Sequence, residues 1–145
     1  MNDIHNKLKN NYQNYIKTND GQEKWSRQFF HKILAQNDVV YITAKESSRS
    51  YLIARIAGDD MEIIALGIDK NYRRKGAATS MINKLIIITK KKKIKRIILE
   101  VSKENTAALN LYKKLGFFTY NVRENYYTIK KKKESAYLMQ KRITF

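Results

Sequence analysis

The sequence predicts a mixed α/β (α+β) fold, with a mostly antiparallel sheet, a central parallel strand–helix–strand crossover and helices on both faces. Two observations lead to this class. The apolar residues follow a helical period before residue 39, a strand period from 39 to 68, and alternating helix and strand periods afterwards. A strand–helix–strand order implies a crossover and so a parallel pair. Because the chain has 145 residues, 43% of them hydrophobic, we expect residues 1–145 to form one domain with one core.

Two helices are predicted in the N-terminal part. The first is indicated by apolar residues at helical spacing, which are Ile4, Leu8, Tyr12, Tyr15 and Ile16. The polar segment Thr18–Gly21 ends that pattern. Ser26 is the expected N-cap of the second helix, and Trp25 stands where a hydrophobic staple would meet Phe30. The second helix has one apolar stripe, formed by Phe29, Phe30, Ile33 and Leu34.

The middle of the chain is predicted to be an antiparallel meander followed by a helix and a strand. The meander strands are expected at 39–44, 51–57 and 61–68, separated by polar turns. A helix is expected from Ala77 to about Thr89, ending in the Lys90–Lys93 run, where lysines suit the negative end of the helix dipole. The apolar run at 96–101 indicates a strand buried on both faces.

A further helix and two strands complete the prediction. Asn105 is the expected N-cap of the helix, and Gly116 is the natural residue just after its end. The apolar stripe of this helix is formed by Ala108, Leu111, Tyr112 and Leu115. Residues 117–122 and 137–143 are expected to be strands, with a lysine-rich loop between them.

Composition limits the classes of function. The net charge of +17 favours a polyanionic partner: nucleic acid, the ribosome, an anionic membrane or a phosphate-rich cofactor. The absence of cysteine excludes a disulfide framework, thiolate metal sites and a cysteine nucleophile. His5 and His31 lie far apart, so we expect no metal site. No apolar run approaches the roughly 18 residues of a membrane helix, and the N-terminus lacks a signal pattern. We therefore expect a cytoplasmic protein that is not bound to a membrane.

The segment from Ile68 to Thr79 joins a strand to a helix through basic residues and Gly76. The first N–H groups of a helix have no partner within the helix, and small residues there let an anion come close. No acidic residue occurs from Lys70 to Leu99, while lysine and arginine are frequent. The segment therefore predicts a cradle for a pyrophosphate group. A glycine at a tight strand-to-helix turn can also be purely structural.

This segment resembles the signature Q/R-x-x-G-x-G/A of the GNAT superfamily of acetyl-CoA-dependent N-acetyltransferases, with Arg73, Gly76 and Ala78 at the signature positions. Two features depart from the common pattern. Lys70 stands where many relatives have a proline, and the third signature position is alanine instead of glycine. Because alanine is tolerated there, the resemblance still implies binding of acetyl-CoA.

Downstream motifs are similar to the RimI-like branch of that superfamily, the bacterial ribosomal-protein N-terminal alanine acetyltransferases. They include Leu99-Glu100-Val101 and the series that starts at Asn105 and ends at Gly116-Phe117. The segments 123–127 and 136–139 look like the closing strands of the branch. The likeness runs from about residue 39 to the C-terminus and does not include residues 1–24, which are expected to hold a poorly matched N-terminal helix.

The resemblance implies three groups of site residues. The strand backbone would hold the pantetheine arm at Leu66, Gly67 and Ile68. The pyrophosphate would be bound at Arg73, Arg74, Lys75, Gly76, Ala77, Ala78 and Thr79, with Asn105 as a further cofactor contact. Glu100 would be the general base and Tyr112 the general acid. Our candidates for contacts with the acceptor peptide are Arg123, Asn125, Tyr126 and Tyr127.

Both catalytic roles agree with the chemistry of acetyl transfer. An amine attacks a thioester only when it is neutral, and a free α-amino group has a pKa of roughly 7.7 to 8.0, against about 10.4 for lysine. A carboxylate therefore removes the proton of an α-amino group more easily than that of a lysine. A tyrosine can donate a proton to the coenzyme A sulfur as it leaves.

Three functions stay open at this point. The resemblance implies acetyl transfer from acetyl-CoA to the N-terminus of a ribosomal protein, by a monomer that needs no metal. The same fold could instead acetylate a lysine side chain or a small amine, although a charge of +17 repels cationic small amines. The third is a basic module without catalysis, whose clusters Lys90–Arg96 and Lys130–Lys133 bind RNA or DNA phosphates. The clusters could also hold an enzyme near ribosomal RNA.

Overall fold

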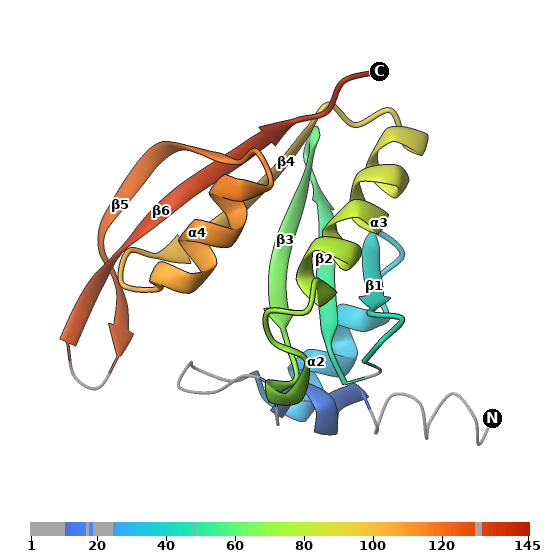
Figure 1. The fold of residues 1–145 in the computed structure, drawn as a ribbon, viewed down its shortest axis with the longest axis horizontal. Helices are drawn as coiled ribbons and strands as arrows, with labels where there is room; N and C mark the ends of the chain where they lie inside the picture. Colours follow the sequence, from blue (N-terminus) through green and yellow to red (C-terminus); the bar gives the residue numbers. More distant parts are fainter. Residues whose placement is uncertain (1–10, 17, 19–24, 48, 130–131) are drawn as a thin grey trace. The chain divides into compact units, whose positions relative to one another are not determined.

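The computed structural model describes residues 11–16, 18, 25–47, 49–129 and 132–145 (Figure 1). Residues 11–16 and 18 are helical, so the predicted first helix is confirmed in part, while Ile4 and Leu8 lie outside the described residues. The remaining elements are α2 (Arg27–Leu34), β1 (Val39–Thr43), β2 (Tyr51–Ala57), β3 (Asp60–Gly67), η1 (Lys70–Tyr72), α3 (Ala77–Lys91), β4 (Arg96–Ser102), α4 (Thr106–Lys114), β5 (Phe118–Ile129) and β6 (Lys132–Arg142). None of the helices in this part of the chain is both long and apolar enough to cross a membrane.

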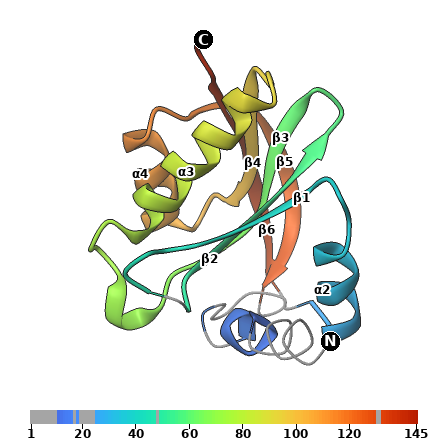
Figure 2. The ribbon, with the colours of Figure 1, turned by 90° about the vertical axis from the view of Figure 1, so that its right-hand side faces the viewer.

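Six strands are hydrogen-bonded in the order β1-β2-β3-β4-β6-β5. The pairs β1–β2, β4–β6 and β5–β6 are antiparallel, and the antiparallel pair β1–β2 can be followed in Figure 2. The pair β3–β4 is parallel, and α3 lies between its strands in the chain. A helix between two parallel strands is the usual crossover. The predicted class, a mostly antiparallel sheet with a parallel strand–helix–strand crossover, is confirmed.

Packing divides the chain into two compact units. Unit 1 consists of Met1–Arg55 and Ala65–Leu85, and unit 2 consists of Ile56–Ile64 and Ile86–Phe145. The expectation of one domain over residues 1–145 stays a prediction.

Unit 1 has an aromatic core. The ring of Tyr15 lies 5.4 Å from that of Trp25, 5.1 Å from Phe30 and 5.7 Å from Tyr51. Tyr15, Phe30 and Tyr51 are almost fully buried, so this cluster removes a large apolar area from water. The predicted start of α2 is confirmed, because the side chain of Ser26 accepts a hydrogen bond from the backbone N–H three residues later, at 3.2 Å. The staple is present as well, with Trp25 6.4 Å from Phe30.

Unit 2 contains β4, β6 and the first part of β3, and one prediction about β4 is wrong. The strand β4 was expected to be buried on both faces, but its residues alternate, with Ile97, Leu99 and Val101 buried and the residues between them half-buried. The reason is that one face of β4 packs into the core, while the other carries Arg96 and Glu100. Ile98 lies between Arg96 and Glu100 on this second face and stays half-buried. An apolar run in the sequence therefore does not show that both faces of a strand are buried.

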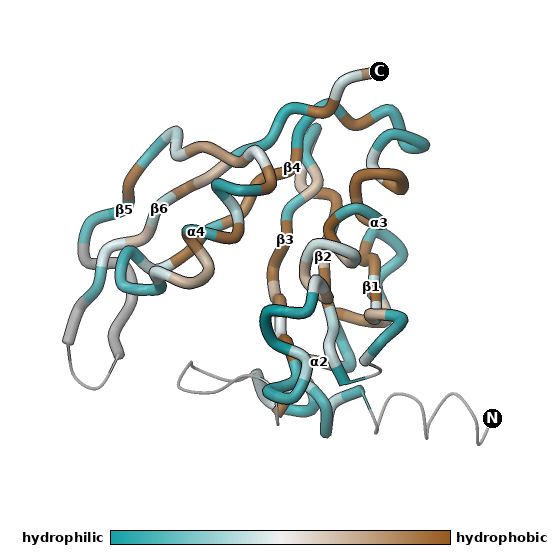
Figure 3. The backbone as a smooth tube through the Cα atoms, in the orientation of Figure 1, coloured by the Kyte–Doolittle hydropathy of each residue, from teal (hydrophilic) through white to brown (hydrophobic). Residues whose placement is uncertain are grey.

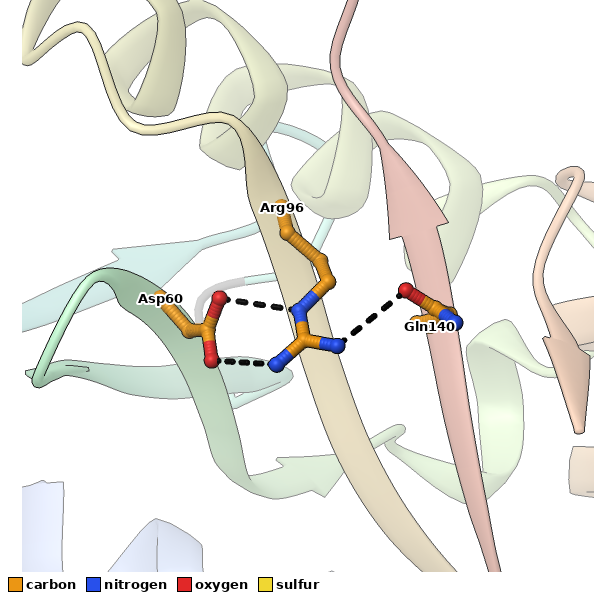
Figure 4. A network of polar contacts seen from close by, with 3 residues as sticks. All are labelled: Asp60, Arg96 and Gln140. Atoms are coloured by element: carbon orange, nitrogen blue, oxygen red, sulfur yellow. Dashed lines mark hydrogen bonds and ion pairs between the residues drawn. The ribbon is translucent and has the colours of Figure 1, made fainter. Parts of the chain in front are cut away.

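The first residue of β4 is fixed by a network of polar contacts (Figure 4). Arg96 donates from Nε to Asp60 Oδ1 at 2.9 Å and from Nη2 to Asp60 Oδ2 at 2.7 Å, and its Nη1 donates to Gln140 Oε1 at 3.3 Å. A bidentate pair of this kind fixes both distance and orientation. It joins the starts of the parallel strands β3 and β4 to β6.

The C-terminal hairpin is longer than predicted. The sequence suggested a lysine-rich loop from residue 123 to 136, but β5 continues to Ile129 and β6 begins at Lys132. The added part of β5 includes Tyr126, Tyr127, Thr128 and Ile129, which are residue types that favour strands, and pairing with β6 satisfies the backbone of the polar residues opposite them. The helix before the hairpin ends as predicted, with Gly116 at a φ of +93°. Its buried residues are Leu109 and Tyr112, of which only the second was placed on the predicted stripe.

Candidate functional site

The turn between β3 and α3 is held by hydrogen bonds within unit 1. Asp69 caps the short helix η1, because its Oδ1 accepts from the backbone N–H of Asn71 at 3.1 Å. The backbone N–H of Asp69 donates to Ser50 Oγ at 3.0 Å, which ties the turn to the loop before β2. Arg74 then adopts a left-handed conformation with a φ of 60°. This conformation costs a non-glycine residue on the order of 1 to 3 kcal/mol and is common at binding sites.

The start of α3 has the local geometry of an anion site. Its first internal hydrogen bond runs from the Ser80 N–H to the Gly76 carbonyl at 2.9 Å, so the N–H groups of Ala77, Ala78 and Thr79 lack partners within the helix. Gly76 has a φ of 82°, and a Cβ built on it would meet no atom within 4 Å. The space in front of the helix is therefore open at this residue, and the helix dipole favours an anion there.

The charges at this helix start have the same sign. The three residues before Gly76, Arg73 to Lys75, are exposed and basic, and the first turn of α3 contains no acidic residue. Arg73 Nε donates to the Ile68 carbonyl at 3.4 Å, and the Lys75 ammonium lies 5.9 Å from the Tyr72 ring centroid. The structure thus brings the predicted residues 73–79 together in one turn. Their assignment to the pyrophosphate of a cofactor stays a prediction.

The parallel pairing of β3 and β4 is short. It joins Met61–Ile63 to Ile97–Leu99, whereas β3 continues to Gly67 and β4 to Ser102. The predicted pantetheine contacts Leu66 and Gly67 lie in this last part of β3, and Ile68 follows directly. The contact of these three residues with a pantetheine arm stays a prediction.

Gly67 is also required by packing inside unit 1. A Cβ at this position would lie 2.5 Å from Tyr51 Cε1 and 2.5 Å from Thr18 Oγ1. Since Tyr51 is 1% exposed and packed among other rings, it has little room to move. The glycine therefore lets β3 approach the buried tyrosine, in addition to any contact with a ligand.

Glu100 lies in unit 2 on the half-buried face of β4, and its side chain is 25% exposed. Its Oε1 is 3.2 Å from Nη1 of Arg123, whose side chain is 49% exposed. Burial raises the pKa of the Glu100 carboxyl above its ordinary value, Arg123 lowers it, and Glu62 on β3 raises it further. The net direction is upward, which brings this carboxyl closer to the pKa range of an effective general base near neutral pH.

The structure places Tyr112 and Asn105 at the two ends of α4. Tyr112 is 6% exposed, and its ring meets that of Phe117 edge-on at 5.6 Å. Asn105 is the N-cap, because its Oδ1 accepts from the Ala108 N–H at 3.2 Å. The capping role predicted for Asn105 is confirmed, while its contact with a cofactor and the acid role of Tyr112 stay predictions.

The four predicted peptide contacts all lie on β5. Arg123 is the ion-pair partner of Glu100, a contact that sequence reasoning missed. The side chains of Asn125, Tyr126 and Tyr127 lie outside the described part of the structure, so their role stays a prediction. Glu62 was missed as well. The sequence does contain a signal for it, because Glu62 in β3 and Glu100 in β4 each lie between two apolar residues. Only the register of the two strands, however, places both glutamates on the same face of the sheet.

Comparisons with known proteins show the family and the fold. The acetyltransferase (GNAT) family model matches residues 3–117. The [ribosomal protein bS18]-alanine N-acetyltransferase of Escherichia coli K12 is 29% identical over 98 residues, a match that covers 68% of this chain and 66% of the relative, just under two thirds of its length.

Two solved structures have the same fold. The ribosomal-protein-S18-alanine N-acetyltransferase from Escherichia coli aligns with a TM-score of 0.84 at 24% identity, over 95% of this chain and 88% of that one. Arabidopsis thaliana NAA60 in complex with acetyl-CoA aligns with a TM-score of 0.79 at 20% identity, over 94% and 93%. The family model spans most of the chain, including the turn before α3, the strand of Glu100 and the helix of Tyr112. The family suggested by the sequence motifs is confirmed: the chain belongs to the acetyltransferase (GNAT) family.

Proposed function

We propose that this chain transfers the acetyl group of acetyl-CoA to the N-terminal α-amino group of a protein, with a ribosomal protein as the acceptor. The observation that carries the proposed reaction is the start of α3, where three backbone N–H groups open beside Gly76 and a run of basic residues. The acceptor class is supported by the relative named as a ribosomal-protein alanine N-acetyltransferase. Family membership supports the type of reaction.

The residues at this helix start fit a diphosphate group. The N–H groups of Ala77, Ala78 and Thr79 would donate to its oxygens, and no protein carboxylate in the first helical turn competes for them. The exposed side chains of Arg74 and Lys75 would add positive charge beside the anion. Acetyl-CoA, when bound, supplies the acetyl thioester.

Two side chains of unit 2 would move protons during the reaction. Glu100 would accept a proton from the attacking amine, so that the new C–N bond can form. Tyr112 would donate a proton to the sulfur as the C–S bond breaks. The half-buried position of Glu100 supports the base role, because burial makes a carboxylate more basic. Glu100 would deprotonate an α-amino group, with a pKa of about 8, more easily than a lysine amine, with a pKa of about 10.4.

The test is acetyl transfer to a matched set of acceptors. One peptide has a free N-terminal alanine, a second has the same sequence with a blocked N-terminus and an internal lysine, and the third acceptor is a small diamine. Because the chain contains no cysteine, a thiol reagent detects only the coenzyme A released. Mass spectrometry then locates the acetyl group. We expect transfer only to the free α-amino group.

Other results identify the alternatives. Acetylation of the blocked peptide would assign the enzyme to lysine side chains, and acetylation of the diamine would assign it to small amines. If no acceptor is modified and acetyl-CoA does not bind, the proposal fails and a basic module without catalysis becomes the better interpretation.

We further propose that the lysine-rich end of α3 holds the enzyme near ribosomal RNA. Lys90–Lys93 and Lys95 are all exposed, and Figure 3 shows hydrophilic backbone at the end of α3 and on both sides of one hydrophobic stretch in the segment that follows. Phosphate contacts made by lysines weaken steeply as salt is added. Cosedimentation with ribosomes should therefore fall sharply between low and high salt. Binding that does not change with salt, or no binding at low salt, would contradict this tether.

A further inference from the structure

The ion pair of Glu100 spans three strands of unit 2. Arg123 is on β5 and Glu100 is on β4, and β6 lies between them in the sheet. The registers align Arg123 with Ala136 and Ser102 in one row, and Glu100 with Leu138 two rows away, on the same face of the sheet. The Arg123 side chain therefore crosses β6 to reach the carboxylate. Ala136 is fully buried and presents only a methyl group, which leaves room for the crossing side chain.

A β-bulge determines which residue of β5 faces Glu100. Phe118 pairs with Gln140 and Thr119 with Met139, but the next pair is Asn121 with Leu138, so Tyr120 is an extra residue. One extra residue in a strand moves all later side chains to the opposite face. Without the bulge, Val122 would stand opposite Ala136 and Arg123 would point away from Glu100. The bulge therefore aims the arginine at the carboxylate.

The bulge is itself anchored to the sheet. The guanidinium of Arg96 lies 5.4 Å from the centroid of the Tyr120 ring, and Arg96 is held by Asp60 and Gln140. Cation–π contacts of this kind stabilise both partners. Two residues of β5, Tyr120 and Arg123, thus reach over β6 to the two charged residues of β4.

We propose that Arg123 is a positioning residue, which holds the Glu100 carboxylate in a fixed orientation and in its charged form and so sets the pH at which Glu100 acts. This inference rests on the proposed role of Glu100 as the general base. It assigns to Arg123 a role in the reaction that differs from contact with the acceptor peptide.

The other charged groups around Glu100 make the role of Arg123 specific. Glu62 on β3 disfavours the charged form of Glu100, as does burial, and Arg123 acts in the opposite direction. Arg96, on the same strand, is already paired with Asp60. On the remaining strands, Glu134 of β6 accepts a hydrogen bond from Ser102, and Glu124 of β5 accepts one from Ser135. Among these charged groups, Arg123 is the cation that favours the charged form of Glu100.

The test compares pH profiles of kcat/KM for three variants with an N-terminal alanine peptide. Arg123→Gln removes the positive charge, so the pKa of Glu100 rises and the acid limb of the profile should move up by about one pH unit. Arg123→Lys keeps the charge and should stay close to the wild type. Glu62→Gln removes a negative charge and should move the same limb downward. The ionisation of the acceptor amine is the same for all variants, so differences between profiles come from the enzyme.

A second readout does not depend on catalysis. The side-chain carboxyl of Glu100 is followed by ¹³C NMR titration and assigned by comparison with Glu100→Gln. Shifts of opposite sign in Arg123→Gln and Glu62→Gln support the inference. An unchanged NMR titration in Arg123→Gln overturns it. A shifted NMR titration with an unshifted rate profile shows that the ion pair acts on Glu100 while Glu100 is not the base, which overturns the catalytic part and the proposed mechanism together.

Discussion

Replacing Glu100 with glutamine should separate catalysis from folding. The change removes one negative charge and keeps the shape of the side chain, so the general base is lost. General base catalysis contributes about 10² to 10⁴ in rate, which corresponds to roughly 2.7 to 5.4 kcal/mol at 1.36 kcal/mol per tenfold. The ion pair with Arg123 is partly exposed, at 25% for Glu100 and 49% for Arg123, so its loss should cost at most about 1 kcal/mol of folding free energy.

The assay for Glu100→Gln measures three quantities. These are the initial rate of coenzyme A release, the acetyl-CoA dissociation constant from calorimetry, and the melting temperature. We expect kcat/KM to fall at least about 100-fold, the affinity to stay near that of the wild type, and the melting temperature to change by no more than about 4 °C. Glu104→Gln is the matched control, because it makes the same chemical change at an exposed position. A wild-type rate in Glu100→Gln, or an equal loss in the control, would refute the reasoning.

Three further predictions test the cofactor site and the fold. Gly76→Asp should raise the acetyl-CoA dissociation constant at least about tenfold, because an aspartate adds negative charge where an anion is expected. The control Gly76→Asn should have a smaller effect, and equal dissociation constants for the two variants in calorimetry would show that charge is not the cause. Gly67→Ala should lower the free energy of unfolding in urea by about 1 to 3 kcal/mol, since its Cβ meets the Tyr51 ring, and an unchanged midpoint would contradict this packing. Arg96→Met should cost about 1 to 2 kcal/mol in the same assay by leaving Asp60 unpaired, and the double variant with Asp60→Asn should recover part of that loss.

The local features of this protein could be predicted from the sequence alone. Ser26 and Asn105 cap their helices as expected, Gly116 follows the end of α4 in a left-handed conformation, and α3 begins directly after Gly76. Each of these features depends on hydrogen bonds or backbone angles within about four residues, so the neighbouring side chains determine them. The family motif lies in the same kind of local segment, between a strand end and a helix start.

Contacts between distant strands were decided only by the tertiary structure. The pairing of Arg123 with Glu100 depends on the extra residue at Tyr120, and nothing in the sequence marks that residue as a bulge. The placement of Glu62 on the same face as Glu100, and the full length of the β5–β6 hairpin, likewise depend on register. The physical reason is that strand side chains alternate with a period of two. A single inserted residue therefore exchanges the two faces of the strand after it. The position of the inserted residue is determined by side-chain packing across the whole sheet.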